Sequence, residues 1–158
     1  MTYLTSAEVS EAMADIGPVE AIRRNRVQVT TTPGRIRAAL RSATSRLQCD
    51  HLVQIATIDT GHEFELFYLL TGAHRTVLSI RTLLPRDRPK IRSVHDLLPP
   101  AGIYERQIHD LLGITFDGHP NLGRIILNED WPEGEFPLRK DWKMDPAKSY
   151  GGAPEEVR

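Results

Sequence analysis

Two histidines and an aspartate have side chains that could ligate a metal ion. His109 and Asp110 are adjacent on a predicted helix, and His119 follows on the far side of a glycine. A helical zinc site needs two histidines at positions i and i+4 together with a further ligand, and this spacing does not provide them. The spacing favours structural or solvated histidines. These three residues are nevertheless the only candidate chemistry if the chain is a stand-alone enzyme.

The single cysteine, Cys49, stands beside Asp50 and His51. A nucleophilic thiol needs a histidine near it in space and a third group that orients the histidine, and sequence adjacency supplies neither. One cysteine also excludes an internal disulfide and any zinc or iron–sulfur site built on several thiolates. We interpret Cys49 as an inert thiol, and its isolation suits a reducing compartment such as the cytoplasm.

Nucleotide binding has no support, because neither the P-loop pattern nor Gly-x-Gly-x-x-Gly follows a candidate strand. Arginines are concentrated on one predicted helix, which has no interleaved aromatic residues. The whole chain is slightly acidic, with 20 Lys+Arg against 21 Asp+Glu. A solvated face or a contact with an acidic protein is therefore favoured over nucleic acid. A charged adaptor that uses this helix remains a separate hypothesis, and its arginines are Arg35, Arg37, Arg41 and Arg46.

The length of 158 residues with 40% hydrophobic side chains indicates one domain that can bury a core without staples. No run approaches the ~18 apolar residues of a membrane-spanning helix. The first residues also lack a basic segment followed by an apolar one, so we expect neither a membrane span nor a secretion signal.

The spacing of apolar residues predicts two helices and a strand in the first part of the chain. Thr5-Ser6-Ala7-Glu8 has the form of a capping box, which predicts a short helix that ends before Gly17. Val27 and Val29 alternate with polar residues, as in a strand. A second helix is predicted to open at Thr32-Pro33. Its apolar stripe consists of Ile36, Leu40, Ala43 and Leu47.

The middle of the chain changes to strand-like runs joined by hairpin-sized connectors. We expect the second run to be a central strand covered on both faces, because both of its faces are at least partly apolar. A charged connector, residues 85–92, precedes a helix over residues 101–112 with Gly113 as its C′ residue. The three strand-like runs are Leu52 to Ile58, Phe64 to Leu70 and Val77 to Leu84.

The last part of the chain is irregular and acidic. Eleven of the 22 Gly and Pro residues lie from Gly113 onward. A short strand is predicted after Gly113 and turns at Asp117-Gly118, and from Asp117 onward only residues 124–127 resemble a strand. Seven arginines and one acid lie between Val19 and Gln48, whereas eleven acids and seven bases lie from Tyr104 to the end. So long an irregular stretch with large apolar groups indicates a function, a partner or disorder. It either wraps its own domain or lies on another subunit.

These patterns predict an α+β fold, with a small mixed or antiparallel sheet of about four strands packed by helices and a long irregular C-terminal extension. We divide the chain into an α+β domain, residues 1–123, and an extended partner-binding tail, residues 124–158. The near-neutral net charge of −1 is then the sum of a basic front and an acidic tail.

Three groups of residues in the second half of the chain form a specific pattern. They are Glu105, Arg106, Asp110 and Gly113; then Phe116, Gly118, His119, Pro120 and Leu122; then Pro137, Leu138, Arg139, Lys140, Asp141 and Trp142. This pattern resembles the signature of the family formed by the C subunit of respiratory complex I, an NADH-quinone oxidoreductase. The similarity extends over about Asp50 to Trp142. Gln107 departs from it, because the family usually has Glu there, and His109 stands where an aromatic residue is common.

The resemblance implies a non-catalytic structural subunit in the hydrophilic arm of an ion-translocating NADH/quinone-type oxidoreductase. It implies docking on the D-type large subunit beside the electron-acceptor site. No cofactor is expected on this chain, and iron–sulfur clusters with flavin or nickel–iron are expected in partner subunits. The alternative is the equivalent subunit of a membrane-bound energy-converting nickel–iron hydrogenase. Either way we expect a peripheral place on the cytoplasmic side of the cell membrane, held there only by the complex, and no nucleic acid partner.

The same resemblance predicts which residues form the partner interface. Arg106 and Asp110 are expected to pin the helix, and the Gly118-His119-Pro120 run is expected to turn the chain. The segment from Trp131 to Trp142 is expected to lie on the partner. The complete predicted set is Glu105, Arg106, Asp110, Gly113, Gly118, His119, Pro120, Trp131, Pro137, Leu138, Arg139, Lys140, Asp141 and Trp142.

Overall fold

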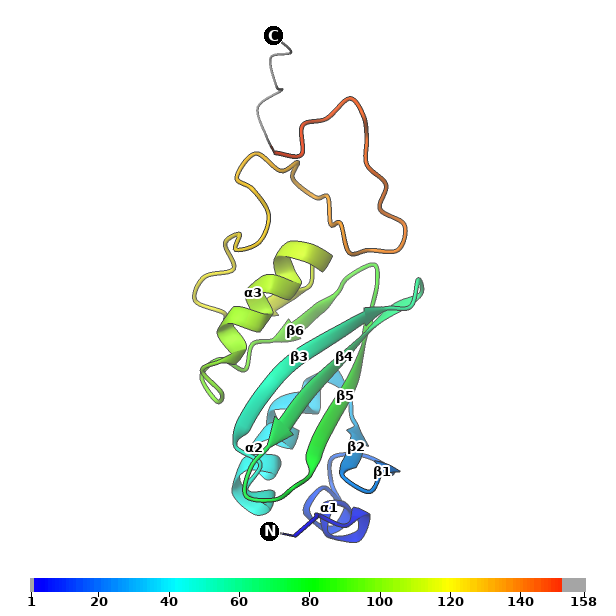
Figure 1. The fold of residues 1–158 in the computed structure, drawn as a ribbon, viewed down its shortest axis with the longest axis vertical. Helices are drawn as coiled ribbons and strands as arrows, with labels where there is room; N and C mark the ends of the chain where they lie inside the picture. Colours follow the sequence, from blue (N-terminus) through cyan, green and yellow to red (C-terminus); the bar gives the residue numbers. More distant parts are fainter. Residues whose placement is uncertain (1, 152–158) are drawn as a thin grey trace.

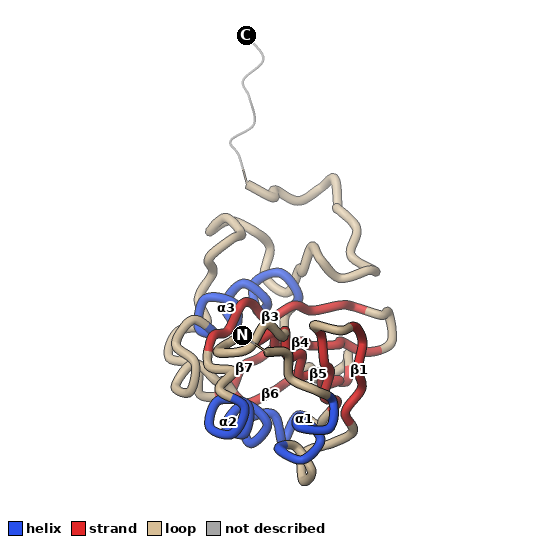
Figure 2. The backbone as a smooth tube through the Cα atoms, turned by 60° about the horizontal axis from the view of Figure 1, so that its bottom comes forward, coloured by secondary structure: helices blue, strands red, loops and turns tan. Residues whose placement is uncertain are grey.

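The computed structural model describes residues 2–151, so residues 152–158 of the predicted tail lie outside the described part. A mixed sheet with helices against it forms the body of the chain, and a tail without helix or strand extends beyond the last helix (Figures 1 and 2). The elements are α1 (Ser6–Ala12), β1 (Val19–Arg23), β2 (Arg26–Thr30), a 3-10 turn (Pro33–Arg35), α2 (Ile36–Leu47), β3 (His51–Asp59), β4 (Glu63–Thr71), β5 (Val77–Pro85), β6 (Lys90–Arg92), α3 (Ala101–Leu112) and β7 (Thr115–Asp117).

The main sheet has five strands in the order β1-β2-β5-β4-β3. Only β2 and β5 are parallel, and the other neighbours are antiparallel. A second, two-stranded parallel sheet pairs β6 with β7. The predicted α+β fold is confirmed, and of the two predicted alternatives, mixed or antiparallel, the sheet is mixed. It has five strands where about four were predicted, because β1 is a strand that the periodicity did not predict, and β6 of the second sheet was not predicted either.

Two predicted segments differ from the structure. The charged connector contains β6, because Ile91 points into the core at 3% exposure between two exposed bases. The strand-like run at residues 124–127 is not a strand. Its backbone N–H groups are bound by a side chain of α3 instead of a neighbouring strand, as the geometry of the site shows.

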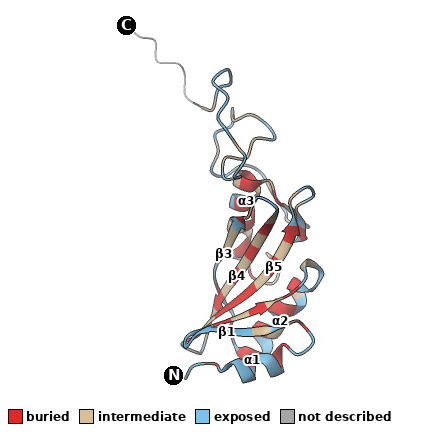
Figure 3. Ribbon diagram, turned by 90° about the vertical axis from the view of Figure 1, so that its right-hand side faces the viewer, coloured by how far each residue is buried: buried red, intermediate tan, exposed pale blue. Residues whose placement is uncertain are grey.

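Buried residues recur along β4 and β5, as Figure 3 shows. Burial alternates along β4, where Phe64, Leu66, Tyr68 and Leu70 are fully buried and the residues between them are half-buried. The prediction that both faces of this strand are covered is therefore wrong for the second face, because the helices that supply the core cover only the first.

The two helical starts follow their sequence signals. The Thr5 side chain accepts the N–H of Glu8 while the Glu8 carboxylate accepts the N–H of Thr5, so the predicted capping box is confirmed. Pro33 opens a 3-10 turn that leads into α2, whose stripe is buried. Among residues 2–151, no helix is long and apolar enough to cross a membrane.

Figure 1 places α3 and the tail at one end of the molecule and α1 with the β1–β2 hairpin at the other. The predicted division near Gly123 stays a prediction, but parts of the following chain contact the body closely. Those contacts centre on α3 and on the loop between β3 and β4.

Candidate functional site

A buried carboxylate joins α3 to the turn before it. Glu105 is 0% exposed and accepts the Oγ–H of Ser93 and the backbone N–H of Val94. Burial raises the pKa of this carboxyl, against the opposing effect of those two hydrogen bonds. Glu105 therefore fixes the start of α3 from inside and presents no carboxylate to a partner.

The next turn of α3 holds the chain that follows β7. Arg106 donates to the carbonyl oxygens of Gly123 and Arg124, at 3.1 and 2.7 Å. One turn later, the Oδ2 atom of Asp110 accepts the successive backbone N–H groups of residues 125, 126 and 127, at 3.1, 2.8 and 2.9 Å. We call Arg106, Asp110 and residues 123–127 the helix clamp.

The positive and the negative side chain of the clamp bind different backbone groups. Arg106 takes the carbonyl groups and Asp110 takes the amides, so five consecutive residues are bound by one helix turn. Burial acts to raise the pKa of Asp110, but the three N–H bonds outweigh it and the pKa is lowered. The carboxylate stays ionised at neutral pH and serves the fold.

The end of α3 makes a second connection to the tail. Gly113 has φ +73°, and an added Cβ there meets two ring carbons of Phe136 at 2.5 Å. The Arg139 guanidinium lies 4.7 Å from the ring centre of Phe136 and 5.4 Å from that of Phe64. The guanidinium also donates to the carbonyl oxygen of Leu112 at 2.7 Å. Burial lowers the pKa of Arg139. These contacts fix the tail between the two aromatic rings.

Asp59, at the end of β3, completes this connection. Its side chain is 2% exposed and forms two hydrogen bonds with Arg86, at 3.0 and 3.1 Å. It also accepts the backbone N–H of Gly61 and, from the tail, that of Lys140. Arg86 reaches on to Asp141. Burial acts to raise the pKa of Asp59, but these donors lower it to about 2.

Sequence reasoning missed Asp59 and Arg86. The Asp-Thr-Gly-His run is typical of an ordinary hairpin connector, and the bond from the Gly61 N–H to Asp59 is indeed the turn that it predicts. Nothing in the spacing indicates that residues 140 and 141 reach this carboxylate and its arginine.

The three candidate metal ligands are not brought together. His109 is bonded through Nδ1 to the carbonyl oxygen of Ile114 beyond the C-terminal end of α3. His119 lies at the other end of the helix, where Nε2 is 2.9 Å from the Gly102 carbonyl oxygen and Nδ1 accepts the N–H of Asn121. Within residues 2–151, no three potential ligands are grouped to hold a metal ion. The stand-alone enzyme hypothesis therefore loses its only candidate cluster.

The tail has a small aromatic centre of its own. Trp131 and Trp142 stack with ring centres 5.8 Å apart, and Tyr150 packs edge-on against both. The Glu135 carboxylate accepts from Trp142 and Tyr150 and pairs with Lys148. The two predicted interface tryptophans are thus half-buried against each other.

A shallow apolar groove lies between β3 and α3. It has a volume of about 210 Å³, and its lining includes Ile55, Tyr104, Gln107 and Leu138. Leu138 is 58% exposed although its N–H is bound to the carbonyl oxygen of Leu111. Gln107, which stands in place of the family glutamate, is in this groove.

The Arg-rich helix is mostly engaged with its own chain. Arg35 donates to the carbonyl oxygen of Asp15, and Arg46 to that of Ala12. Arg37 forms a two-point ion pair with Asp96, at 2.7 Å for both bonds, and lowers the pKa of that carboxyl. The adaptor hypothesis thus loses three of its four arginines.

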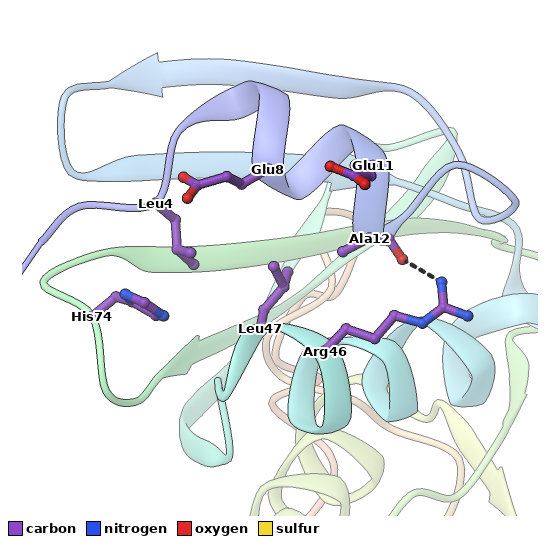
Figure 4. A pocket seen from close by; sticks show the side chains of 7 residues that line it. All are labelled: Leu4, Glu8, Glu11, Ala12, Arg46, Leu47 and His74. Atoms are coloured by element: carbon purple, nitrogen blue, oxygen red, sulfur yellow. Dashed lines mark hydrogen bonds between the residues drawn. The ribbon is translucent and has the colours of Figure 1, made fainter.

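A hollow of about 460 Å³ lies between α1 and α2, and charged side chains that line it are also bonded to the chain itself (Figure 4). Glu8 and Arg46 are among the residues that line it, but the Glu8 carboxylate is used in the capping box and Arg46 donates to the carbonyl oxygen of Ala12. Glu11, His74 and two leucines complete the wall. Its geometry shows a structural junction and no arrangement for acid–base work.

The family model for the 30 Kd subunit of the respiratory-chain NADH dehydrogenase matches residues 29–148. The chain belongs to this family. The matched range includes the main-sheet strands β3, β4 and β5, the helix clamp and the Asp59 connection, so the whole signature lies inside it.

Named relatives of the family come from different organisms. The C subunit of the F420H2 dehydrogenase of Methanosarcina mazei is 38% identical over 106 residues, which cover 65% of this chain and 66% of the relative. The C subunit of the NADH-quinone oxidoreductase of Acidothermus cellulolyticus is 38% identical over 101 residues, covering 63% and 48%. The matched part thus spans about half to two thirds of the length of these relatives.

Two solved structures share the fold. One is from the membrane-bound sulfane sulfur reductase, described as an archaeal respiratory membrane complex. It has a TM-score of 0.75 at 26% identity and covers 86% of this chain and 84% of the other. The other is a trypsin-resistant fragment of Nqo5, with a TM-score of 0.62 at 24% identity, covering 72% and 95%. The second supports the fold alone.

Within this family member, the predicted interface residues separate by burial. Glu105 and Asp110 are buried, and a middle group is half-buried in the helix clamp, the Gly113 contact and the aromatic centre. Gly118 has φ +81° and turns the chain as expected. The half-buried residues are Arg106, Gly113, His119, Trp131, Pro137, Arg139 and Trp142, and the exposed ones are Gly118, Pro120, Leu138, Lys140 and Asp141.

Proposed function

We propose that the chain is a structural, non-catalytic subunit in the hydrophilic arm of a complex-I-like, ion-translocating oxidoreductase. The observation that carries this is the use of the signature side chains. Charged groups that could do chemistry, Glu105, Arg106 and Asp110, are bonded to the chain's own backbone. Family membership supplies the class of complex, because named relatives are subunits of dehydrogenases.

The connections around α3 explain the role of such a structural protein. The helix clamp, the Phe136 contact at Gly113 and the Asp59 connection join three separate stretches of chain into one body. A partner that docks there meets a surface whose shape is already set, so little ordering cost is added on binding. Holding the partner in a fixed position is the role that this rigidity supports.

We assign the partner contact to the groove between β3 and α3 and to its exposed rim. Leu138 lines the groove and is 58% exposed, and Ile103, which is 62% exposed, precedes the lining residue Tyr104 on α3. Apolar groups in a pre-formed groove are typical of an interface core. The proposed partner is the D-type large subunit, beside the electron-acceptor site.

The cofactors and location follow from the same proposal. Iron–sulfur clusters and flavin belong to partner subunits, and this chain binds none. It sits peripherally on the cytoplasmic side of the membrane through the complex. The relatives and solved structures are named as dehydrogenases and as a sulfane sulfur reductase, so no observation favours the hydrogenase alternative.

A tagged full-length chain tests this proposal in the organism that makes the complex. The wild-type chain should co-purify from solubilised membranes with a D-type subunit and its cluster-bearing neighbours. Leu138→Asp places a charge in the groove and should lower co-purification about ten-fold, which corresponds to ~1.4 kcal/mol. Leu138→Met keeps an apolar side chain and is the matched control.

Two results would overturn the proposal. One is a wild-type chain that purifies alone from membranes that contain the assembled complex. The other is full co-purification of Leu138→Asp, which would remove the groove from the interface. Circular dichroism of each variant checks that the fold is unchanged, and the exposure of Leu138 predicts that it is.

A further inference from the structure

Four arginines without acidic partners lie at the end of the sheet opposite α3. Arg23, Arg24 and Arg26 belong to the β1–β2 hairpin, and Arg75 to the connection between β4 and β5. All four are exposed. Within residues 2–151, no salt bridge involves any of them. We call these four residues the basic end.

Backbone pairing brings the hairpin and the connection together. Arg23 is the register partner of Arg26 across the hairpin, and Arg26 is in turn the register partner of Val77 on β5. The N–H of Val77 donates to the carbonyl oxygen of Asn25 at 2.8 Å, which fixes the hairpin tip beside β5. Arg75 precedes Val77, the first residue of β5, by two residues and therefore lies at the same end of the sheet as the hairpin tip.

The N-terminal segment contacts two of the four arginines. The N–H of Arg75 donates to the carbonyl oxygen of Thr2 at 3.1 Å. The next residue, Tyr3, carries the Arg24 guanidinium over its ring at 5.1 Å from the ring centre. This stacking holds Arg24 in place while its donors stay open to solvent. The four charges are thus gathered by backbone contacts and not by a shared acid.

The composition of the basic end favours a protein partner. Arginine and tyrosine are enriched in protein interfaces, where lysine is depleted. Every basic Lys or Arg residue before Lys90 is arginine. Tyr3 and Ile22 are 37% and 40% exposed beside the charges, so the surface also offers apolar area. A guanidinium binds a carboxylate through two parallel hydrogen bonds, which suits Asp and Glu side chains.

We propose that the basic end is a second docking surface, which binds an acidic segment of another subunit of the same complex. This proposal rests on the proposed function, because it needs neighbouring subunits. Figure 1 places the β1–β2 hairpin, which carries three of the four arginines, and α3, which lines the groove, at opposite ends of the molecule. The chain would then join two neighbours across the length of its sheet, with the carboxylates of the second one neutralising four like charges.

Site-specific photo-crosslinking in the intact complex tests the docking surface. A photoreactive amino acid replaces Ile22, which is exposed beside the arginines. The expected adduct is a peptide rich in Asp and Glu from one neighbouring subunit. In the same background, the combined change Arg23→Gln, Arg26→Gln and Arg75→Gln should lower the adduct yield about ten-fold at about 0.15 M salt.

A matched control removes charge elsewhere. Arg41 and Arg88 are exposed arginines away from the hairpin, and Arg41→Gln with Arg88→Gln should leave the adduct yield unchanged. An adduct with phospholipid or with nucleic acid would overturn the proposal, as would the absence of an adduct in an assembled complex. An adduct yield that does not respond to the three arginine changes would overturn it too.

Failure of the second docking surface is distinguishable from failure of the proposed function. If the complex assembles through the α3 groove while Ile22 gives no protein adduct, only the second docking surface is wrong. If the tagged wild-type chain enters no complex, the proposed function fails first.

Discussion

Three carboxylates near the signature take their bonds from the chain itself. Glu105 accepts from Ser93 and the Val94 N–H, and Asp110 accepts three successive amides. Asp59 binds Arg86 and two amides. The three differ in their electrostatics, because burial raises the pKa of Glu105, whereas N–H and guanidinium donors lower the pKa of the two aspartates. At the residue scale, the carboxylates of the signature therefore form hydrogen bonds that hold separate segments of the chain together.

Asp59 predicts an acid-dependent loss of stability. Its pKa falls from the usual 3.8 to about 2 in the folded state, because Arg86 and two amides favour the carboxylate. A lowered folded-state pKa contributes stability above the unfolded pKa, and that stability is lost as the pH falls through the folded value. The contribution of about 2 kcal/mol should disappear between about pH 4 and pH 2.

Urea unfolding of the wild-type chain and of Asp59→Asn between pH 2 and pH 7 measures this. The variant should be about 2 kcal/mol less stable at pH 7, and the difference should shrink as the pH falls below 4. A constant difference across this range would contradict the assignment of the pKa shift to Asp59.

Asp110→Asn should loosen the chain after β7. The amide oxygen keeps the shape of the acceptor but loses the charge that strengthens all three N–H bonds, so the free energy of unfolding should fall by about 1–2 kcal/mol. Hydrogen exchange of the amides at residues 125–127 should accelerate specifically. Asp130→Asn is the control, because Asp130 is exposed in the same part of the tail. Equal exchange rates in the two variants would count against the clamp.

At the element scale, α3 organises the site from three places along its length. Glu105 fixes its beginning, Arg106 and Asp110 bind the loop on its side, and Gly113 lets Phe136 approach its end. The helix and its C′ glycine were predictable, because the apolar spacing and Gly113 are local signals. The partners were not, because the loop and tail that bind α3 have no period that shows where they return.

Comparing Gly113→Ala with Gly61→Ala should separate backbone strain from the steric clash between an added Cβ and the Phe136 ring. Gly113 has φ +73°, and a Cβ would also stand 2.5 Å from Phe136, so we expect a loss of about 3 kcal/mol in the free energy of unfolding. Gly61→Ala is the matched control. Its φ is +91° with nothing within 4 Å of an added Cβ, so only the strain of about 1 kcal/mol remains. Urea unfolding of both variants checks the difference, and equal losses would mean that Phe136 does not pack on Gly113.

At the scale of the whole molecule, the change of period from helix to strand was enough to predict an α+β fold with a small mixed or antiparallel sheet, but not to decide between the two. The edge strand β1 was missed because four of its five residues are exposed and show no alternation. β6 was missed because it is three residues long. For the site, the resemblance named segments that lie around α3, but spacing alone could not tell that Glu105 and Asp110 are buried.

The Arg-rich helix illustrates the same limit in the other direction. Spacing placed its arginines on one face, yet three of them bind their own chain. Four exposed arginines that form no salt bridge within residues 2–151 lie at the β1–β2 hairpin and the β4–β5 connection, and only the backbone pairing of distant strands gathers them. Long-range topology, which periodicity does not encode, decides which charges are available to a neighbour.

Docking into a respiratory-type complex through the face around α3 and the tail is the role that we propose for this chain. Deleting residues 129–158 removes most of the tail, whereas the helix clamp at residues 123–127 and the sheet remain. We expect a truncated chain that folds, shown by a cooperative melt, but whose recovery in the purified complex falls about ten-fold or more. A fully assembled, active complex that contains the truncated chain would contradict this role.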